Sequence, residues 1–293
     1  MRSCTTNRPG GCLIQVSDPP TWRRLLGEAA DLLGDRTDAR RIVEEASGYE
    51  GAELTVHLDG PANALTLAQF DAMVERRAAG EPLQYVLGRW GFRSLDVFVD
   101  KRVLIPRPET EVVVEHALAM VDTLGARVAV DLGTGSGVIA LSLAVERSQL
   151  SVWATDASDS ALDVARANLA GIGRAATRVR LGKGDWFTAL PQELAGTIDV
   201  VVANPPYVAA HDELPPEVAN WEPHEALIAG PTGLEAVERI VRDAPEWLQP
   251  HGAVVLEIGE TQAERALELC ADYAQAEVRT DLAGRPRVLV AVR

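Results

Sequence analysis

A glycine-rich loop constrains the fold of this chain more than any other feature of its sequence. It follows a strand-like segment at residues 127–131, precedes a helical pattern at 137–145, and has the spacing GxGxG: Gly133, Thr134, Gly135, Ser136 and Gly137. Glycine lets the backbone turn sharply and lets a ligand approach the main chain closely. The first turn of a helix offers N–H groups that have no partner within the helix. The loop therefore predicts a strand–loop–helix unit that holds a small molecule.

Strand-like and helical segments alternate around this loop. The strand-like segments lie at residues 127–131, 151–155, 178–181, 198–203, 253–258, 276–280 and 287–292, and helical patterns at 137–145, 158–170, 233–248 and 261–273. Such alternation favours an α/β fold, a parallel sheet with helices on both faces. The last two strands are joined by only residues 281–286, which is too short for a parallel crossover. We therefore expect a Rossmann-like seven-stranded sheet whose last strand runs antiparallel.

Residues 21–80 show a different pattern, with apolar residues at three- and four-residue spacing. Trp22 and Leu25 begin the first of three helical runs, and Thr66 is a candidate cap of the third. Residues 85–103 alternate, which predicts a β-hairpin or linker. The expected organisation is a disordered tail at 1–20, a small helical bundle at 21–80, a β-hairpin linker at 81–105 and the α/β domain at 106–293.

The charge balance argues against one class of partner. Lys plus Arg number 28 and Asp plus Glu 43, which gives a net charge of −15, and no run of basic residues offsets it. Such a surface repels a phosphate backbone, so tight non-specific nucleic-acid binding is not expected. Cys4, Cys12 and Cys270 form no CxxC pattern, which predicts neither a zinc site nor a disulfide framework. No apolar run has the length of a membrane span or the pattern of a signal peptide, and we expect a cytoplasmic protein.

The glycine loop lacks the features of a pyrophosphate-binding loop. A dinucleotide fingerprint would have a glycine at Val138, and a Walker loop would continue as Gly-Lys-Ser/Thr. We therefore predict that the loop holds the amino-acid part of S-adenosylmethionine (SAM), with a tight turn without a ligand as the structural alternative. Asp156, at the end of the second strand, could accept hydrogen bonds from both ribose hydroxyls, or cap a helix. Trp186, after the third strand, could pack on the adenine or fill the core.

The fourth strand, residues 198–203, ends in a segment suited to an –NH2 group: Asn204, Pro205, Pro206 and Tyr207. Two prolines stiffen the turn and remove two N–H donors. The Asn204 side-chain oxygen and the Pro205 carbonyl are left to accept both amine hydrogens. An amide nitrogen is a poor nucleophile, so two acceptors that fix its orientation would promote its methylation. Tyr207 would pack against the flat amide, whereas a proline-rich turn is the structural alternative.

Taken in order, these segments resemble the HemK/PrmC family of protein-(glutamine-N5) methyltransferases. The resemblance runs from about Trp22 to the C-terminus and includes 80–85 (GEPLQY), 105–111 (IPRPETE), the glycine loop, 204–207 (NPPY) and 222–227 (EPHEAL). It implies a class I SAM-dependent methyltransferase fold. It also implies methyl transfer to the glutamine of the Gly-Gly-Gln motif in peptide chain release factors, which tunes translation termination.

The resemblance further assigns roles to residues. The glycine loop, Asp156, Trp186 and Asn204 would contact SAM, with S-adenosylhomocysteine as the product. The segment from Asn204 to Tyr207 would hold the substrate amide, with catalytic roles for Asn204, Pro205 and Tyr207. The helical domain would dock the release factor. We expect a monomer without a metal, a membrane contact or direct contact with nucleic acid.

Several alternatives stay open at this point. Residues 106–111 could shape the pocket or only start a helix. Residues 106–109 read PRPE where the branch acting on a ribosomal protein typically has Pro-Arg-Ser-Pro, which favours release factors over that branch. The NPPY segment would also suit the exocyclic amine of adenine in DNA or RNA, although the charge of −15 argues against it. A SAM-binding protein without catalysis is disfavoured by the intact Asn204 and Pro205.

Overall fold

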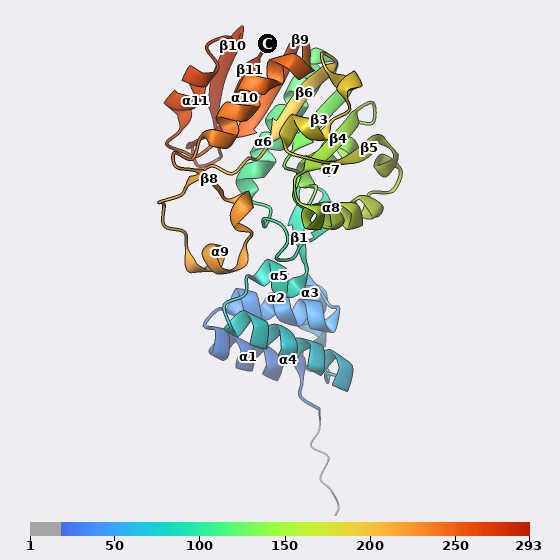
Figure 1. Ribbon diagram of the computed structural model, residues 1–293. Coiled ribbons are helices and arrows are strands. Elements are labelled where there is room, and N and C mark those ends of the chain that lie inside the picture. The colour runs from blue at the N-terminus through green and yellow to red at the C-terminus, as the bar shows by residue number, and fades with distance from the viewer. Residues whose placement is uncertain (1–18) are drawn as a thin grey trace, which may run out of the picture. The chain divides into compact units, whose positions relative to one another are not determined.

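The computed structural model describes residues 19–293, which form two compact units (Figure 1). The first unit ends at Ala79, and the second runs from Gly80 to Arg293. Nearly all of the expected tail at residues 1–20, including Cys4 and Cys12, lies outside the described residues. Each unit buries its own set of apolar side chains.

The N-terminal unit is a small helical bundle, as the spacing of its apolar residues predicts. Its helices are α1 (Trp22–Leu33), α2 (Arg36–Ser47), α3 (Gly51–His57) and α4 (Ala64–Ala78). Trp22 packs edge-on against Phe70 with ring centroids 6.4 Å apart, which joins α1 to α4. The predicted cap at Thr66 is wrong, because Asn63 Oδ1 accepts hydrogen bonds from the N–H groups of Leu65 and Thr66 and starts α4 earlier.

The segment after the bundle contains the predicted hairpin in a shorter form. Strands β1 (Arg89–Phe92) and β2 (Leu95–Phe98) pair antiparallel. The residues before them form helix α5 (Leu83–Leu87) rather than a strand, because Pro82 starts the helix and Gly88 ends it in a left-handed conformation. Asn168 ties the hairpin to the glycine loop. Its Oδ1 accepts from Phe98 N at 2.7 Å, and its Nδ2 donates to Ser136 O at 2.8 Å.

The second unit is built on a seven-stranded sheet with the order β10-β11-β9-β6-β3-β4-β5. Its strands are β3 (Val128–Leu132), β4 (Ser151–Asp156), β5 (Val179–Lys183), β6 (Ile198–Ala203), β9 (Leu248–Glu257), β10 (Gln275–Thr280) and β11 (Pro286–Val292). The pairs among β9, β6, β3, β4 and β5 are parallel, and β11 is antiparallel to both of its neighbours. The predicted fold and the reversed last strand are confirmed.

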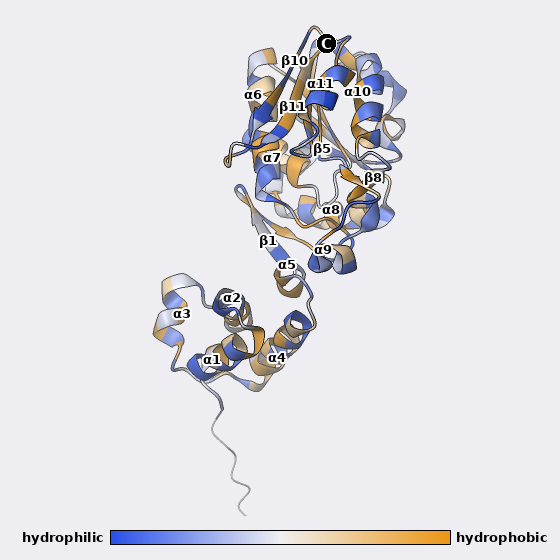
Figure 2. Cartoon of the chain, turned by 90° about the vertical axis from the view of Figure 1, so that its left-hand side faces the viewer, coloured by the Kyte–Doolittle hydropathy of each residue, from blue (hydrophilic) through white to orange (hydrophobic). Residues whose placement is uncertain are grey.

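Helices cover both faces of this sheet (Figure 1). The side chains of α6 (Pro108–Leu124), α7 (Val138–Glu146) and α8 (Asp159–Gly171) pack into one apolar cluster, and those of α10 (Glu235–Trp247) and α11 (Ala263–Leu269) into another. Successive strand residues alternate between the clusters, so Val200 faces the first and Val201 the second. Figure 2 shows hydrophobic colouring along β11 and hydrophilic colouring on α11, which covers it. Helix α11 is shorter than the predicted 261–273.

Short elements complete the second unit. They are the 3₁₀ turns η1 (Gly173–Arg178), η2 (Trp186–Ala189), η3 (Gln192–Leu194) and η4 (His224–Ala226), helix α9 (Pro216–Trp221), and the paired strands β7 (Val208–Ala209) and β8 (Ile228–Gly230). Within residues 19–293, no helix combines the length and the apolar character needed to cross a membrane.

Candidate functional site

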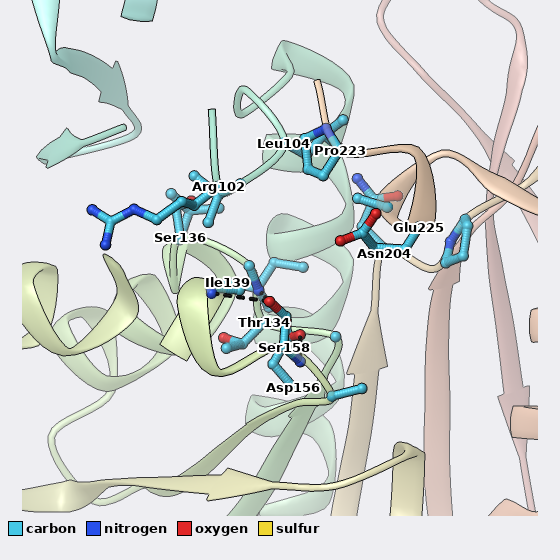
Figure 3. Close-up of a pocket in the computed structure, with 18 of the residues that line it drawn as sticks. Arg102, Leu104, Thr134, Ser136, Ile139, Asp156, Ser158, Asn204, Pro223 and Glu225 are labelled. Carbon is cyan, nitrogen blue, oxygen red and sulfur yellow. Dashed lines mark hydrogen bonds between the residues drawn. The ribbon is translucent and has the colours of Figure 1, made fainter. Parts of the chain in front are cut away.

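A cavity of about 460 Å³ lies at the carboxyl ends of the central parallel strands (Figure 3). The chain leaves β3 toward β4 on one side and later returns to place β6 on the other, and ligands of open α/β sheets bind at such a switch point. The cavity wall contains residues from the glycine loop, from the turns after β4, β5 and β6, from the first turn of α6, and from residues 102–106 and 223–226. Figure 3 shows Ser136 and Arg102 on the opposite side of the cavity from Asn204 and Glu225.

The glycine loop has the backbone conformation that its spacing predicts. Gly133, Gly135 and Gly137 have φ angles of 72°, 54° and 91°, which L side chains rarely adopt. A Cβ atom on Gly133 would lie 3.5 Å from the Trp186 ring, and one on Gly137 would lie 3.3 Å from Leu141 Cδ1. Residues 133–136 line the cavity. Gly137 does not; it is the N-cap of α7, and the space beside its Cα is filled by Leu141 and Ala165.

A buried carboxyl group supports this loop from below. Asp131 is fully buried at the end of β3, and its Oδ2 accepts hydrogen bonds from Thr134 Oγ1 at 2.6 Å and Ala140 N at 3.1 Å. Its Oδ1 has no partner among residues 19–293. Burial raises the pKa of Asp131 to about 7. The sequence analysis did not single out this residue, although an acidic residue inside an apolar strand is the signal that could have found it.

Asp156 reaches the cavity and also organises the loop. Its Oδ2 accepts from Gly135 N at 2.9 Å, and its Oδ1 accepts from Ser158 N at 2.9 Å. Ser158 is the side-chain cap of α8, because its Oγ accepts from Ala161 N. The cap alternative for Asp156 therefore fails, and the carboxylate lies on the cavity wall beside backbone N–H groups. Burial raises the pKa of Asp156 despite these bonds.

Trp186 also reaches the cavity, and its neighbour fills the core instead. Trp186 has a φ of 51°, a conformation that costs free energy for a large side chain. Its ring lies against Gly133. Phe187 is buried and stacks on Trp247 with ring centroids 5.7 Å apart. The packing role thus falls mainly to Phe187, which leaves part of Trp186 on the cavity wall.

The side-chain amide of Asn204 lies on the wall opposite Ser136 and is held from behind. Asn204 Nδ2 donates to Thr110 Oγ1 at 3.1 Å, and Thr110 Oγ1 donates to Glu257 Oε2 at 2.7 Å. Asn204 Oδ1 has no hydrogen-bond partner within the described part of the chain. The site therefore presents a hydrogen-bond acceptor at the position where the sequence analysis expects one.

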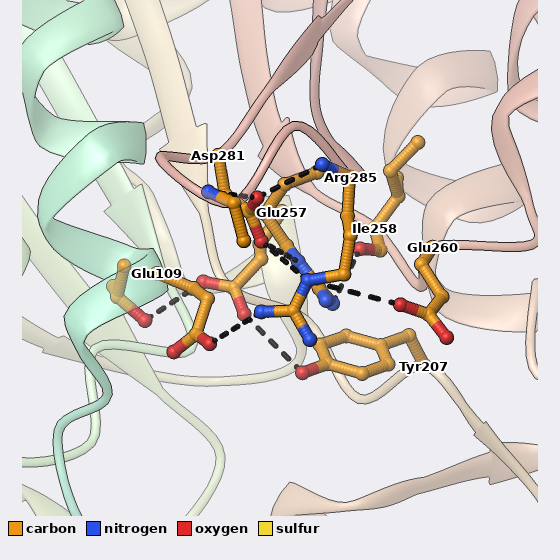
Figure 4. Close-up of polar contacts among 10 residues, drawn as sticks. Glu109, Tyr207, Glu257, Ile258, Glu260, Asp281 and Arg285 are labelled. Atoms are coloured by element: carbon orange, nitrogen blue, oxygen red, sulfur yellow. Dashed lines mark hydrogen bonds and ion pairs between the residues drawn. The ribbon is translucent and has the colours of Figure 1, made fainter.

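The rest of the NPPY segment divides between the cavity and the interior. Pro206 lines the cavity, whereas Pro205 is buried and Tyr207 does not border the cavity. Tyr207 Oη donates to Glu257 Oε1 at 3.3 Å (Figure 4), and Tyr207 O accepts from Gln262 Nε2 at 3.0 Å. Burial beside Glu257 raises the pKa of Tyr207. The structure thus brings Asn204 and Pro206 to the cavity with the glycine loop, whereas the Tyr207 hydroxyl bonds to Glu257.

An ion pair joins two of the segments that carried the resemblance. The carboxylate of Glu222 is buried, pairs with Arg107 and accepts from Ile105 N at 3.1 Å. Residues 222–227 are thereby fixed to residues 105–111, and both segments contribute to the cavity wall. Pro108 begins α6, so the latter segment both starts a helix and shapes the pocket. Among residues 19–293, no group of three or more His, Cys, Asp and Glu side chains is placed to hold a metal ion.

Comparisons with known proteins cover both units. Residues 22–88 match the PrmC N-terminal domain model, and residues 110–220 match the methyltransferase small domain model. A protein of Xylella fastidiosa (strain 9a5c) named release factor glutamine methyltransferase is 42% identical, over 87% of this chain and 92% of that protein. A protein of Moorella thermoacetica with the same name is 39% identical, over 93% of this chain and 99% of that protein.

Solved structures share the fold at lower identity. The hMettl16 catalytic domain, solved in complex with the MAT2A 3'UTR hairpin 6, is 17% identical with a TM-score of 0.50. The match covers 78% of this chain and 80% of that chain. At this identity the likeness concerns the arrangement of the sheet and its helices.

Proposed function

The chain belongs to the release factor glutamine methyltransferase family, and we propose that it methylates peptide chain release factors. It is a SAM-dependent protein glutamine methyltransferase. The proposed acceptor is the side-chain amide nitrogen of the glutamine in the Gly-Gly-Gln motif, and the proposed consequence is tuning of translation termination. The observation that carries the proposal is the free acceptor Asn204 Oδ1, which lies on the wall of the same cavity as the glycine loop.

The residues around the cavity fit SAM. The loop glycines leave room for a ligand to approach the backbone, and a cavity of about 460 Å³ has the size of a cofactor site. Asp156 would accept hydrogen bonds from the ribose hydroxyls, and Trp186 would pack on the adenine. SAM supplies an electrophilic methyl group on a sulfonium, and S-adenosylhomocysteine is the product. The loop residues Gly133 to Ser136 would hold the amino-acid end.

The acceptors of the NPPY segment would prepare the amide for attack. Asn204 Oδ1 would accept one hydrogen of the substrate –NH2 group, and the carbonyl of the buried Pro205 is the proposed acceptor of the other. Together they would fix the direction of the nitrogen lone pair. The nitrogen–methyl bond forms as the sulfur–methyl bond breaks, and the nitrogen becomes cationic. Its extra proton then leaves to water, so no strong base is needed before attack. The two acceptors also stabilise the positive charge as it develops.

We further place docking of the protein substrate on the N-terminal helical unit. Its match to the PrmC N-terminal domain model supports this role. The net charge of −15 favours a partner with a basic surface. The same charge disfavours the adenine of a nucleic acid as the acceptor.

The test is transfer of label from radiolabelled SAM. The substrates are a purified release factor, the same factor with Gln→Ala in its Gly-Gly-Gln motif, and purified ribosomal proteins. Label on the native factor alone is expected. Equal label on the Gln→Ala factor would reject the proposed site. Label on a ribosomal protein alone would move the function to that branch, and label on neither, with SAM bound normally, would reject both protein substrates.

A further inference from the structure

We propose that Thr110 and Glu257 are positioning residues of this reaction, which set the direction that the side-chain amide of Asn204 faces. The inference rests on the proposed function, because it concerns the acceptor that would hold the substrate amide. Neither residue belongs to the glycine loop or to the NPPY segment, and only Thr110 borders the cavity.

The fold brings the three side chains together from separate elements. The parallel pair β6 and β9 aligns Ala203 with Leu256, so Asn204 and Glu257 follow at neighbouring positions at the carboxyl edge of the sheet. Thr110 lies in the first turn of α6 and is buried, as is Glu257. The hydrogen bonds run from Asn204 Nδ2 to Thr110 Oγ1 and from Thr110 Oγ1 to Glu257 Oε2, at 3.1 Å and 2.7 Å.

The direction of these two hydrogen bonds decides whether the oxygen or the nitrogen of the Asn204 amide faces the cavity. The two ends are nearly equal in size and differ in hydrogen bonding alone. An ionised Glu257 can only accept, so the Thr110 hydroxyl donates to it and keeps its lone pairs for Asn204 Nδ2. Asn204 Oδ1 is then left facing the cavity. The reverse orientation would direct –NH2 of Asn204 at –NH2 of the substrate, two donors without an acceptor.

A protonated Glu257 would not impose this order. Its carboxyl hydrogen could be donated to Thr110 Oγ1, and the Thr110 hydroxyl could then donate to Asn204 Oδ1, which favours the unproductive orientation. Burial raises the pKa of Glu257 to about 7. The charged and titratable groups around Glu257 are Glu109 on α6, Tyr207 after β6, Glu260 after β9, and Asp281, Arg285 and Arg287 around the β10–β11 turn (Figure 4). The Asn204 amide therefore faces the cavity with its oxygen when the pH is above the pKa of Glu257, and it loses this orientation as the pH falls through that pKa.

The first test compares variants of one side chain at pH 8.5 or above, which is about the range where an acid of this pKa is ionised. Thr110→Val keeps the shape and removes the hydroxyl, and we expect kcat to fall about 10-fold to 100-fold. Because the defect lies in orientation, SAM affinity and the KM for the release factor should stay near the values of the unmodified enzyme. Thr110→Ser restores the hydroxyl and should restore kcat to within about twofold. Thr123→Val, an exposed position on the same helix, is the control and should leave kcat unchanged.

The second test follows kcat from about pH 6 to about pH 9. The unmodified enzyme should show an acidic limb near pH 7, in which kcat falls as the pH falls. Glu257→Gln cannot titrate and should lose this limb. The proposal is overturned by an unchanged kcat in Thr110→Val, by an unmodified enzyme without the limb, or by a Glu257→Gln variant that keeps it.

A third measurement does not depend on activity. The side-chain amide ¹⁵N–¹H signals of Asn204, identified by their absence in Asn204→Asp, should shift with pH in the unmodified enzyme and stay constant in Glu257→Gln. If the enzyme labels no amide substrate while these signals shift with pH, the proposed function fails, but the proposal that Thr110 and Glu257 orient Asn204 stands. If the release factor is labelled while the signals do not shift with pH, the proposed function stands and only the proposal about Thr110 and Glu257 fails.

Discussion

Two halves of the cavity each rest on a buried carboxyl group, but they are assembled in different ways. Beneath the glycine loop, Asp131 bonds to partners three and nine residues away. Beneath Asn204, Glu257 bonds to Thr110 and Tyr207, which are 147 and 50 residues away. The glycine loop of the cofactor half is therefore held mainly by its own contiguous segment, and Asp156 and Trp186 join it from the turns after β4 and β5. The other half, which we call the substrate half, comprises Asn204, Thr110 and Glu257. It exists only after the sheet has brought these separate segments together.

The largest expected effect tests whether the substrate half can fail alone. Asn204→Ala removes the free acceptor, and loss of one positioned hydrogen-bonding group commonly lowers kcat by about 100-fold to 1,000-fold. We expect a fall of that size in methyl transfer to the release factor. SAM affinity, measured by calorimetry, should fall much less than kcat, because the glycine loop and Asp156 are untouched and Asn204 is only one of the expected SAM contacts. Near-normal transfer by this variant would remove Asn204 from the mechanism.

The next prediction compares the two buried carboxyl groups as contributors to stability. The pKa of Asp131 is about 7 in the folded protein, against about 4 in an unfolded chain. Between these values the folded state binds more protons than the unfolded state, so stability falls as the pH rises from about 4 to about 7. One such group contributes at most about 1.4 kcal/mol per pH unit. The slope declines near pH 7, where the group begins to ionise in the folded protein too, so the change between about pH 5 and about pH 7 is roughly 2 kcal/mol.

Urea unfolding of Asp131→Asn at several pH values measures this contribution. The variant should lose a smaller amount of stability over the same pH range than the unmodified protein, whatever its stability at one pH. Glu257→Gln should reduce the slope in the same sense, because burial raises the pKa of Glu257 to about 7 as well. If the stability of Asp131→Asn and that of the unmodified protein change equally with pH, the Asp131 carboxyl is ionised in the folded protein and the prediction fails.

Asp156 gives the third prediction, which tests whether the cofactor half can fail alone. Asp156→Ala removes a charge-assisted acceptor pair and should weaken SAM binding by roughly 1.5–3 kcal/mol. The KM for the release factor should change little. Asp159→Ala is the matched control, because this neighbouring aspartate is exposed and pairs with the exposed Lys183. Equal SAM affinities in calorimetric titrations of Asp156→Ala and the control would refute the ribose assignment.

The difference between the halves explains what the sequence could predict. Glycine spacing and strand alternation are local, and they located the loop, Asp156 and the reversed strand β11. The roles of Thr110 and Glu257 depend on the pairing of β6 with β9 and on the placement of α6, which no local pattern encodes. A threonine in the first turn of a helix or a glutamate at the end of a strand is not in itself a sign of a functional role, so the sequence did not single out Thr110 or Glu257.

Errors at element ends have a similar cause. Thr66 and Asn63 are both acceptable caps, and the choice depends on which backbone N–H groups lie within reach of the side chain. Residues 85–87 begin the alternating stretch 85–103 that predicts a hairpin or linker, yet residues 83–87 form a helical turn between a proline and a left-handed glycine. Tyr207 was expected against the substrate amide, and that role stays a prediction, since its hydroxyl bonds to Glu257 outside the cavity wall.

The smallest expected effects come from the glycines, and they separate ligand binding from folding within the cofactor half. Gly133→Ala places a side chain at a φ of 72°, which costs about 1–2 kcal/mol, and the new methyl group points at the Trp186 ring on the cavity wall. Both stability and SAM affinity should fall. Gly137→Ala meets a similar backbone cost and a tight contact with Leu141, but it lies off the cavity. It should lower stability while SAM affinity falls less.

Gly171→Ala completes the series as a control. Gly171 ends α8 without a positive φ, and an added Cβ meets no atom within 4 Å. Alanine there restricts the unfolded chain and should leave stability unchanged or raise it by up to about 1 kcal/mol. Urea unfolding and calorimetric titration of the three variants give the comparison. If Gly133→Ala and Gly137→Ala weaken SAM binding equally, SAM affinity depends on the conformation of the whole loop. Close contact between Gly133 and the ligand then makes no separate contribution to binding.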